Sequence, residues 1–252
     1  MIKIIKDKLS EREQIFSAAT ERVDVSDVVS EIIERVKGEG DCALYYFAEK
    51  FDRVKLDSIR VSQEEISEAR AAVEPEFIRI LESAAENIRA FHEKQKNDGF
   101  ELKEKDGVIV GQKVTPVDCA GLYVPGGTAA YPSTVLMDAI PAKIAGVPRV
   151  VMVSPPDRQG KINPVILAAA SVAGVDEIYK VGGAQAVAAL AYGTETVPKT
   201  DKIVGPGNAY VAEAKRQVYG TVSIDMIAGP SEIMIIADGT NRPKDIAADL
   251  LS

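Results

Sequence analysis

Residues 177–192 read Glu-Ile-Tyr-Lys-Val-Gly-Gly-Ala-Gln-Ala-Val-Ala-Ala-Leu-Ala-Tyr. The first five residues, which include Ile178, Tyr179 and Val181, are expected to form a short strand. Gly182 and Gly183 then turn the chain into an alanine-rich helix. The same order of strand, glycine turn and helix recurs on both sides of this stretch. Because consecutive parallel strands are joined by right-handed crossover helices, the repetition predicts a parallel sheet covered by helices on both faces.

The first hundred residues differ from the alternating region because they are helix-rich and charged. Ser62 and Glu65 have the spacing of a capping box, as do Ser10 and Glu13, and Ser26 is expected to cap a further helix. The expected helices span 10–19, 26–37, 41–51, 62–72, 77–91, 133–145, 163–173, 184–192 and 209–218. The expected strands span 107–114, 119–124, 149–153, 177–181, 202–204 and 223–227.

Composition excludes several classes of protein. The formal net charge of -8 over 252 residues argues against binding to the phosphate backbone of a nucleic acid. The apolar runs are shorter than the roughly 18 residues of a membrane-spanning helix, and the N-terminus lacks the pattern of a signal peptide, so we expect a cytoplasmic protein with no membrane partner. Cys42 and Cys119 are far apart and outside any CxxC pattern, which indicates buried free thiols.

Three glycine turns connect strands to helices, at Gly126-Gly127, Gly182-Gly183 and Gly205-Pro206-Gly207. Such a turn points free backbone N–H groups and the positive end of a helix dipole at a ligand, which suits phosphate or carboxylate. None of the three has the GxGxxG spacing of a dinucleotide fingerprint, and for each turn taken alone a tight connection is favoured over a ligand site.

Polar side chains follow these strands. Tyr123 ends the strand before Gly126, Gln185 lies in the first turn of a helix, Asn208 precedes another helix, and Ser231 lies in a turn near the C-terminal end. Each has a structural explanation: a core tyrosine, a solvated glutamine, an N-cap and a turn residue. Because the carboxyl ends of parallel strands meet at one edge of a sheet, their co-occurrence predicts a shared binding cleft.

The sequence contains no complete set of acid/base residues. Its one histidine, His92, lies at the charged end of a helix, and a structural role is favoured there over a catalytic one. A G-x-S-x-G elbow, a P-loop and an HExxH motif are absent as well. From the residues alone, the chain therefore lacks an obvious acid/base group.

Four motifs resemble histidinol dehydrogenase. They read Gly-Leu-Tyr-Val-Pro-Gly-Gly over 121–127, Gly-Gly-Ala-Gln-Ala over 182–186, Lys-Ile-Val-Gly-Pro-Gly-Asn-Ala over 202–209, and Ile-Asp-Met-Ile-Ala-Gly-Pro-Ser-Glu over 224–232. The last motif is the most specific, and in it an apolar run on each side of the Gly229-Pro230-Ser231 turn predicts two short buried strands, the second over 233–237.

The resemblance implies an NAD- and zinc-dependent enzyme that oxidises L-histidinol to L-histidine through the aldehyde, as the last step of histidine biosynthesis. By motif, Tyr123, Gln185 and Asn208 match NAD-contacting positions, and Ser231 matches a substrate-contacting position. A homodimer is implied for the intact enzyme. The zinc ligands and the Glu-His acid/base pair of the family match no position in this chain.

For the fold, the expectation is an α/β protein with two Rossmann-like domains, the second inserted into the first, and an N-terminal helical arm. The arm would span 1–20, the first, incomplete domain 21–125 with 233–252, and the inserted domain 126–232.

A helix beginning at Pro243 still shows an apolar face at Ser252, without a capping glycine. That pattern predicts a fragment of a longer enzyme, inactive by itself. Two alternatives stay open, namely a non-catalytic nucleotide-binding α/β module and a fragment that mainly mediates association through exposed apolar residues.

Overall fold

A parallel β-sheet forms the centre of the fold. The structure is a computed structural model, and it describes residues 24–126, 130–227 and 233–251. Five strands hydrogen-bond in the order β5-β4-β3-β6-β7, and every neighbouring pair is parallel. The strands are β3 (Cys119–Tyr123), β4 (Arg149–Ser154), β5 (Glu177–Lys180), β6 (Lys202–Val204) and β7 (Ser223–Ile224). The expected α/β fold class is confirmed.

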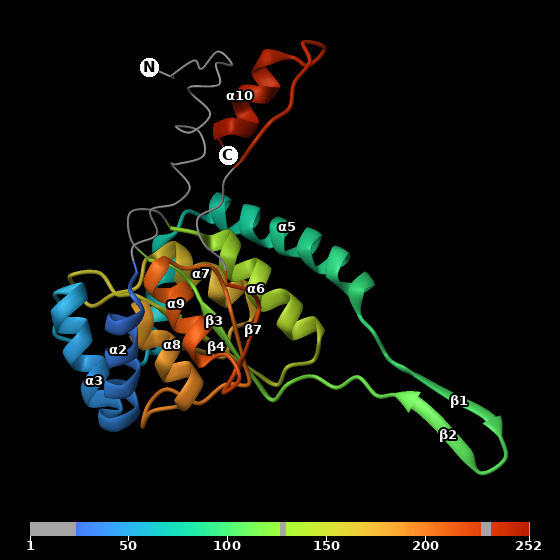
Figure 1. Ribbon diagram of the computed structural model, residues 1–252. Coiled ribbons are helices and arrows are strands. Elements are labelled where there is room, and N and C mark those ends of the chain that lie inside the picture. Colours follow the sequence, from blue (N-terminus) through green and yellow to red (C-terminus); the bar gives the residue numbers. More distant parts are fainter. Residues whose placement is uncertain (1–23, 127–129, 228–232, 252) are drawn as a thin grey trace, which may run out of the picture.

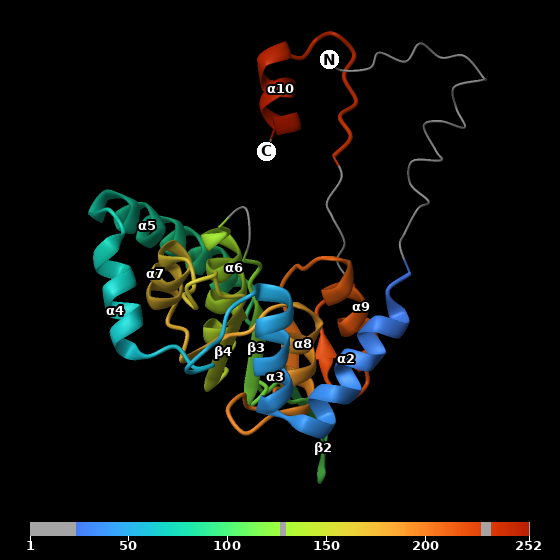
Figure 2. The same cartoon turned by 90° about the vertical axis from the view of Figure 1, so that its left-hand side faces the viewer.

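The sheet is wound in both directions from its central strand β3, with β4 and β5 on one side and β6 and β7 on the other. Helices α6 (Pro132–Ile144) and α7 (Pro164–Ala173) cover one face, whereas α8 (Gly183–Tyr192) and α9 (Ala209–Val218) cover the opposite face (Figure 2). Successive residues of β3 enter different cores: Leu122 packs in the cluster on the α6 side and Tyr123 in the cluster on the α8 side. Both faces of the sheet are therefore buried.

The N-terminal helices form an outer layer on each side. Helices α2 (Ser26–Glu39) and α3 (Asp41–Phe47) pack on α8, while α4 (Gln63–Ala72) and α5 (Pro75–His92) pack on α7. Helix α3 continues into a π-helical turn, η1 (Ala48–Asp52), which ends at Arg53 in the left-handed region with φ 58°. A short 3₁₀ turn, η2 (Glu93–Gln95), follows α5.

Helix starts follow the expected signals with one exception. The capping box before α4 is complete, because the Ser62 N–H donates to Glu65 Oε2 at 2.9 Å and the Glu65 N–H donates to Ser62 Oγ at 3.2 Å. Ser26 does not cap α2. It is the first helical residue, and its N–H donates to the carboxylate of Asp24 at 3.0 Å. The helix expected over 10–19 lies outside the described residues, as does the arm over 1–20.

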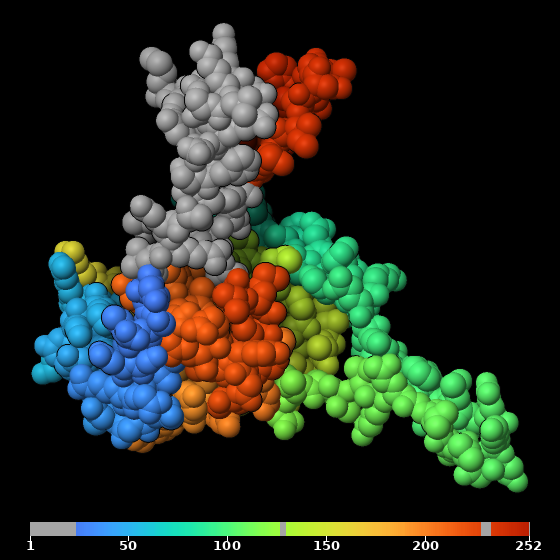
Figure 3. Space-filling model, viewed as in Figure 1, coloured from blue at the N-terminus to red at the C-terminus, as the bar shows by residue number. Residues whose placement is uncertain are grey.

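A β-hairpin projects from the body (Figures 1 and 3). The strand expected over 107–114 is present as β2 (Val108–Gln112). It pairs antiparallel with β1 (Phe100–Lys105), a strand that was not among those expected from the sequence. All residues of both strands are exposed. Period-two patterning therefore identified extended chain here without identifying a buried face.

The second apolar run of the C-terminal motif is not a strand. Residues 233–238 have no regular secondary structure, and Ile233, Met234 and Ile236 are exposed. The first run, expected as a strand over 223–227, is a strand only over Ser223–Ile224, and Met226 and Ile227 are exposed. The expectation of two buried strands is therefore wrong for both runs. Helix α10 (Pro243–Leu251) begins at the expected proline, contains no buried residue and stands apart from the sheet in both ribbon views.

The expectation of two buried thiols is wrong for Cys42, which is exposed, whereas Cys119 is buried.

The division into a first domain and an inserted domain over 126–232 stays a proposal. Strand β3 pairs with β4 and β6, so the strand pairing favours drawing the boundary of the inserted unit before Cys119 rather than after Pro125. Within the described ranges, no helix combines the length and the apolar character needed to cross a membrane.

Candidate functional site

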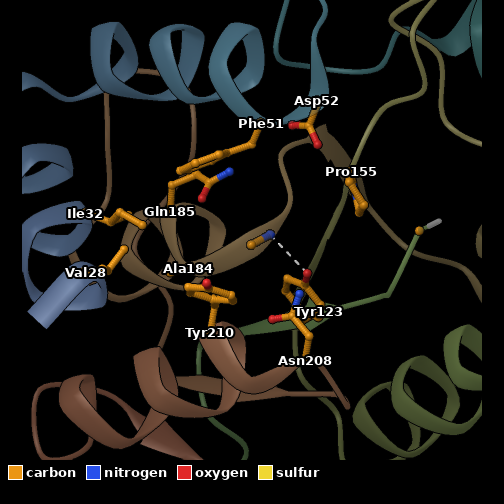
Figure 4. Close-up of a pocket in the computed structure, with 12 residues that line it drawn as sticks. Val28, Ile32, Phe51, Asp52, Tyr123, Pro155, Ala184, Gln185, Asn208 and Tyr210 are labelled. Atoms are coloured by element: carbon orange, nitrogen blue, oxygen red, sulfur yellow. Dashed lines mark hydrogen bonds between the residues drawn. The ribbon is translucent and has the colours of Figure 1, made fainter. Parts of the chain in front are cut away.

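A cavity of about 410 Å³ opens at the carboxyl ends of the central strands (Figure 4). Segments that follow β3, β4, β5 and β6 each contribute to its wall, and helix α2 and the η1 turn close it from the other side. The lining residues are Val28, Ile32, Phe51, Asp52, Tyr123, Gly126, Pro155, Gly183, Ala184, Gln185, Asn208 and Tyr210.

The cavity lies at the switch point of the sheet. From β3 the chain moves to β4 on one side, and it later crosses to β6 on the other side, so the connections after β3 and β6 leave the sheet in opposite directions. A crevice forms where such connections diverge, and open α/β sheets bind ligands there. The sheet topology therefore places the cavity at the usual ligand site of this fold class.

Tyr123 connects two of the glycine turns. Its side chain is 4% exposed, and its hydroxyl oxygen accepts a hydrogen bond from the Gly183 N–H at 3.0 Å. Burial raises the pKa of Tyr123 to about 12, so the phenol is neutral and keeps its proton. The hydroxyl can donate that proton to a ligand while it accepts from Gly183.

The Gly182-Gly183 turn starts helix α8 beside the cavity. Gly183 has φ +66°, a backbone conformation that favours glycine, and a Cβ built on it would lie 2.8 Å from Gln185 Oε1, so the Gln185 side chain would have to shift. Gln185 is 3% exposed, and its amide has no hydrogen-bond partner within the described ranges. An amide buried against a cavity in this way is available to a bound ligand.

Asn208 has a structural role and also faces the cavity. Its Oδ1 accepts a hydrogen bond from the Val211 N–H at 3.1 Å, which makes it the N-cap of α9 as expected. The amide nitrogen of Asn208 stays available as a donor, and the Asn208 and Tyr123 side chains lie side by side in Figure 4. Tyr123, Gln185 and Asn208 are thus gathered in one cavity, whereas Ser231 lies outside the described residues.

A buried charged cluster lies beneath the turn that carries Asn208. Lys215, which is 1% exposed, donates to the Gly205 carbonyl oxygen at 3.0 Å and forms an ion pair with Asp225. Asp225 in turn accepts from the Gly205 N–H at 2.9 Å. Asp138 Oδ2, on α6, is buried without a hydrogen-bond partner. Both backbone polar groups of Gly205 are therefore held by side chains of one ion pair.

Asp138 shares the positive charge of Lys215 with Asp225. Burial and, to a smaller extent, the charge of Asp225 raise the pKa of Asp138, Lys215 opposes both effects, and the net result is a pKa of about 7. Because the folded-state pKa lies above the ordinary value of 3.8, the contribution of Asp138 to stability is fully present below that pH and is lost as the pH rises through about 7.

The Asp138→Asn variant is expected to gain stability relative to the unmodified chain as the pH rises. With each pKa unit worth about 1.4 kcal/mol, and about two units separating pH 5 from the folded-state pKa, the gain should be about 3 kcal/mol larger at pH 8 than at pH 5. Urea unfolding at both pH values measures it, and Asp118→Asn, at an exposed position, is the matched control. If the free energy of unfolding of the variant differed from that of the unmodified chain by the same amount at both pH values, the raised pKa of Asp138 would be contradicted.

His92 lies in a different cavity of about 490 Å³, whose wall also includes Val114, Thr115 and Pro116 beside the hairpin. Its Nδ1 is 2.6 Å from Gln95 Oε1, which fits the structural role favoured for it. Among the described residues, no three His, Cys, Asp or Glu side chains are grouped so that they could hold a metal ion. The described donor set therefore does not fit zinc.

Sequence reasoning missed half of the cavity wall. Pro155 directly follows β4, but the rule that selected Tyr123 considered polar side chains at strand ends and so passed over a proline. Phe51 and Asp52 come from the η1 turn, more than sixty residues before β3, and only the packing of the N-terminal helices brings them to the cavity. No local sequence signal marks them.

The family model for histidinol dehydrogenase matches residues 16–252, almost the whole chain. The chain belongs to the histidinol dehydrogenase family. The histidinol dehydrogenase of Geobacillus kaustophilus is 59% identical over 224 residues, which cover 89% of this chain and 53% of that protein. The histidinol dehydrogenase of Clostridium acetobutylicum is 52% identical over 257 residues, covering 100% of this chain and 60% of the relative.

Histidinol dehydrogenase from Elizabethkingia anophelis has a crystal structure that matches the fold with a TM-score of 0.89 at 43% identity, covering 98% of this chain and 58% of that one. The resemblance seen in the four motifs is thereby confirmed, and with it the assignment to a family of oxidoreductases. The chain spans between half and two thirds of the length of these relatives.

Proposed function

We propose that the cavity binds NAD and that the whole protein oxidises L-histidinol to L-histidine through histidinal, with reduction of NAD. The observation that carries the proposal is the gathering of Tyr123, Gln185 and Asn208 around one cavity at the switch point of a doubly wound sheet. Family membership supports the same reaction.

The residues that line the cavity suit the chemical groups of a dinucleotide. Phe51 and Tyr210, which are 46% and 43% exposed, offer aromatic surface for a base. The N-terminus of α8 presents backbone N–H groups and a positive dipole end, which suits a pyrophosphate. The amides of Gln185 and Asn208 and the phenol of Tyr123 supply hydrogen bonds that fix orientation.

When bound, NAD supplies the hydride acceptor for the two oxidations. The residues of this chain hold the dinucleotide and exclude water from it, while the neutral Tyr123 phenol donates a hydrogen bond and retains its proton. Ser231 is proposed to contact the substrate. Zinc is proposed for the whole protein only, and no step is assigned to it because the described donor set does not fit a metal.

The Asn208→Ala variant tests the cavity as the NAD site. Loss of the N-cap of α9 is expected to lower the free energy of unfolding by about 1 kcal/mol, and loss of the amide should weaken NAD binding by about fivefold or more. Calorimetric titration with NAD measures the affinity, and urea unfolding measures the stability. Asn163→Ala, which removes the N-cap of α7 away from the cavity, is the matched control.

The control should lose stability and keep its NAD affinity. No NAD binding by the unmodified chain at millimolar ligand would contradict the proposal, and so would an affinity equal in all three proteins. The control separates loss of a cap from loss of a ligand contact.

We further propose that the 252-residue chain does not turn over histidinol by itself. The chain contains a single histidine, His92, and its cavity is not the one that Tyr123 lines. Sustained NADH production from histidinol, zinc and NAD would contradict this. Binding of NAD without turnover would fit both this proposal and the alternative of a nucleotide-binding module. A cytoplasmic location and a homodimer remain proposals that rest on the family resemblance.

A further inference from the structure

Asp52 is the one ionisable carboxylate among the described residues that line the NAD cavity. It is half-buried at the end of the η1 turn, and no hydrogen bond or ion pair to it exists within the described ranges. Figure 4 shows its carboxylate at the cavity wall opposite Asn208, in line with Pro155 and Tyr123. Both oxygens are therefore free to accept hydrogen bonds from a ligand.

The backbone around Asp52 is irregular in a way that fixes its position. The π-helical turn over Ala48–Asp52 ends at Arg53, which is the one non-glycine residue with positive φ in the described part of the chain. Single π-helical turns and left-handed non-glycine residues are both uncommon, and both occur preferentially at functional sites. The irregularity directs two consecutive residues, Phe51 and Asp52, to the cavity wall.

Phe51 and Asp52 present two different chemistries side by side. The Phe51 ring stacks on Phe47 at 5.4 Å with the planes 5° apart, so it forms a rigid apolar face. Asp52 is the next residue in the chain and lines the same cavity, so its carboxylate borders the face on which a base could stack. A carboxylate is well suited to accept hydrogen bonds from two vicinal ribose hydroxyls, as acidic residues do in other NAD sites.

The charge of the cavity wall also favours a ribose hydroxyl over a ribose 2′-phosphate. None of its described lining residues is a lysine or an arginine. Lys50, whose Nζ lies 5.4 Å from the centre of the Phe51 ring, is not part of the lining. A ribose 2′-phosphate requires a cationic partner and is repelled by a carboxylate, whereas a hydroxyl requires only an acceptor.

We propose that Asp52 accepts hydrogen bonds from the ribose hydroxyls on the adenine side of the bound dinucleotide and thereby excludes ligands that carry a 2′-phosphate. This specificity role rests on the proposed NAD site. Burial raises the pKa of Asp52 to about 6, so the side chain is mainly ionised at neutral pH and gains a partner when the ligand binds.

Calorimetric titration of the full chain with NAD and NADP at pH 7.5 tests the role. The unmodified chain should bind NAD at least about tenfold more tightly than NADP. In Asp52→Asn the NAD affinity should fall by about tenfold, and the preference for NAD over NADP should fall by about the same factor. Asp57→Asn, at an exposed position close in sequence, should change neither value.

A second measurement does not depend on the variant folding. The unmodified chain is titrated with ADP and with 2′-deoxy-ADP, and loss of the 2′-hydroxyl should weaken binding by about tenfold. Equal affinity for the two nucleotides would overturn the role of Asp52, as would an unchanged NAD preference in a folded Asp52→Asn variant. If the unmodified chain bound neither NAD nor ADP, the proposed NAD site itself would be wrong, and this inference with it.

Discussion

Replacing Lys215 by methionine is expected to lower the free energy of unfolding by about 3 to 5 kcal/mol, the range found when one partner of a buried ion pair is removed. Methionine fills a similar volume, so the loss is electrostatic and not a cavity effect. The substitution leaves Asp225 and Asp138 without their shared cation, and it also leaves the Gly205 carbonyl without its donor. Uncompensated carboxylates in a buried position are the larger part of the penalty.

Urea unfolding followed by circular dichroism measures the effect, with Arg216→Met as the control. Arg216 is the next residue on α9, but its side chain is exposed and its ion pair with Glu213 is open to solvent on that side, so that variant should lose less than about 1 kcal/mol. The penalty in Lys215→Met should shrink at pH 5, because Asp138, with its raised pKa, is then protonated. Equal losses in the two variants would show that the buried cluster is not a stabilising element.

The fold of the alternating region could be predicted because local and long-range signals agree there. Residues 177–192 contain a short segment with strand-forming residues, two glycines and an alanine-rich segment in the order that one βα unit needs, and the structure has β5 and α8 at those positions. The N-cap role of Asn208 follows from its side chain alone. Such signals depend only on neighbours in the sequence.

Elements whose environment is set by distant parts of the chain were predicted less well. The run over 233–237 is as apolar as a buried strand, yet those residues are exposed in the structure, because apolar composition records a need for burial without naming the partner. The hairpin formed by β1 and β2 shows the same limit, since alternation identified extended chain but not its pairing.

The candidate site shows the same division. Tyr123 and Asn208 could be placed together because the carboxyl ends of parallel strands share one edge of the sheet. Asp52 could not be placed there from the sequence, because its position depends on helix packing and on a π-helical turn that no residue pattern predicts. The Lys215 cluster was also missed, because a lysine on an otherwise amphipathic helix is indistinguishable in sequence from a solvated one.

Replacing Gly205 by alanine is the most direct test of how the switch point is built. Gly205 has φ +115°, and a Cβ built on it would lie 2.1 Å from the Tyr123 carbonyl oxygen, so the ends of β3 and β6 would have to separate. The strained backbone and the clash together are expected to lower the free energy of unfolding by at least about 3 kcal/mol. Because both strand ends border the cavity, NAD affinity should fall as well.

The matched control for this variant is Gly38→Ala, near the end of α2. No atom lies within 4 Å of the Cβ that would be added there, and the backbone at Gly38 is helical, so alanine should stabilise the chain by up to about 1 kcal/mol. Urea unfolding and NAD titration of both variants measure the contrast. If Gly205→Ala unfolded at the same urea concentration as the unmodified chain, the close approach of β6 to β3 would not be what shapes the cavity. A loss of stability with full NAD affinity would separate the packing of the two strand ends from ligand binding.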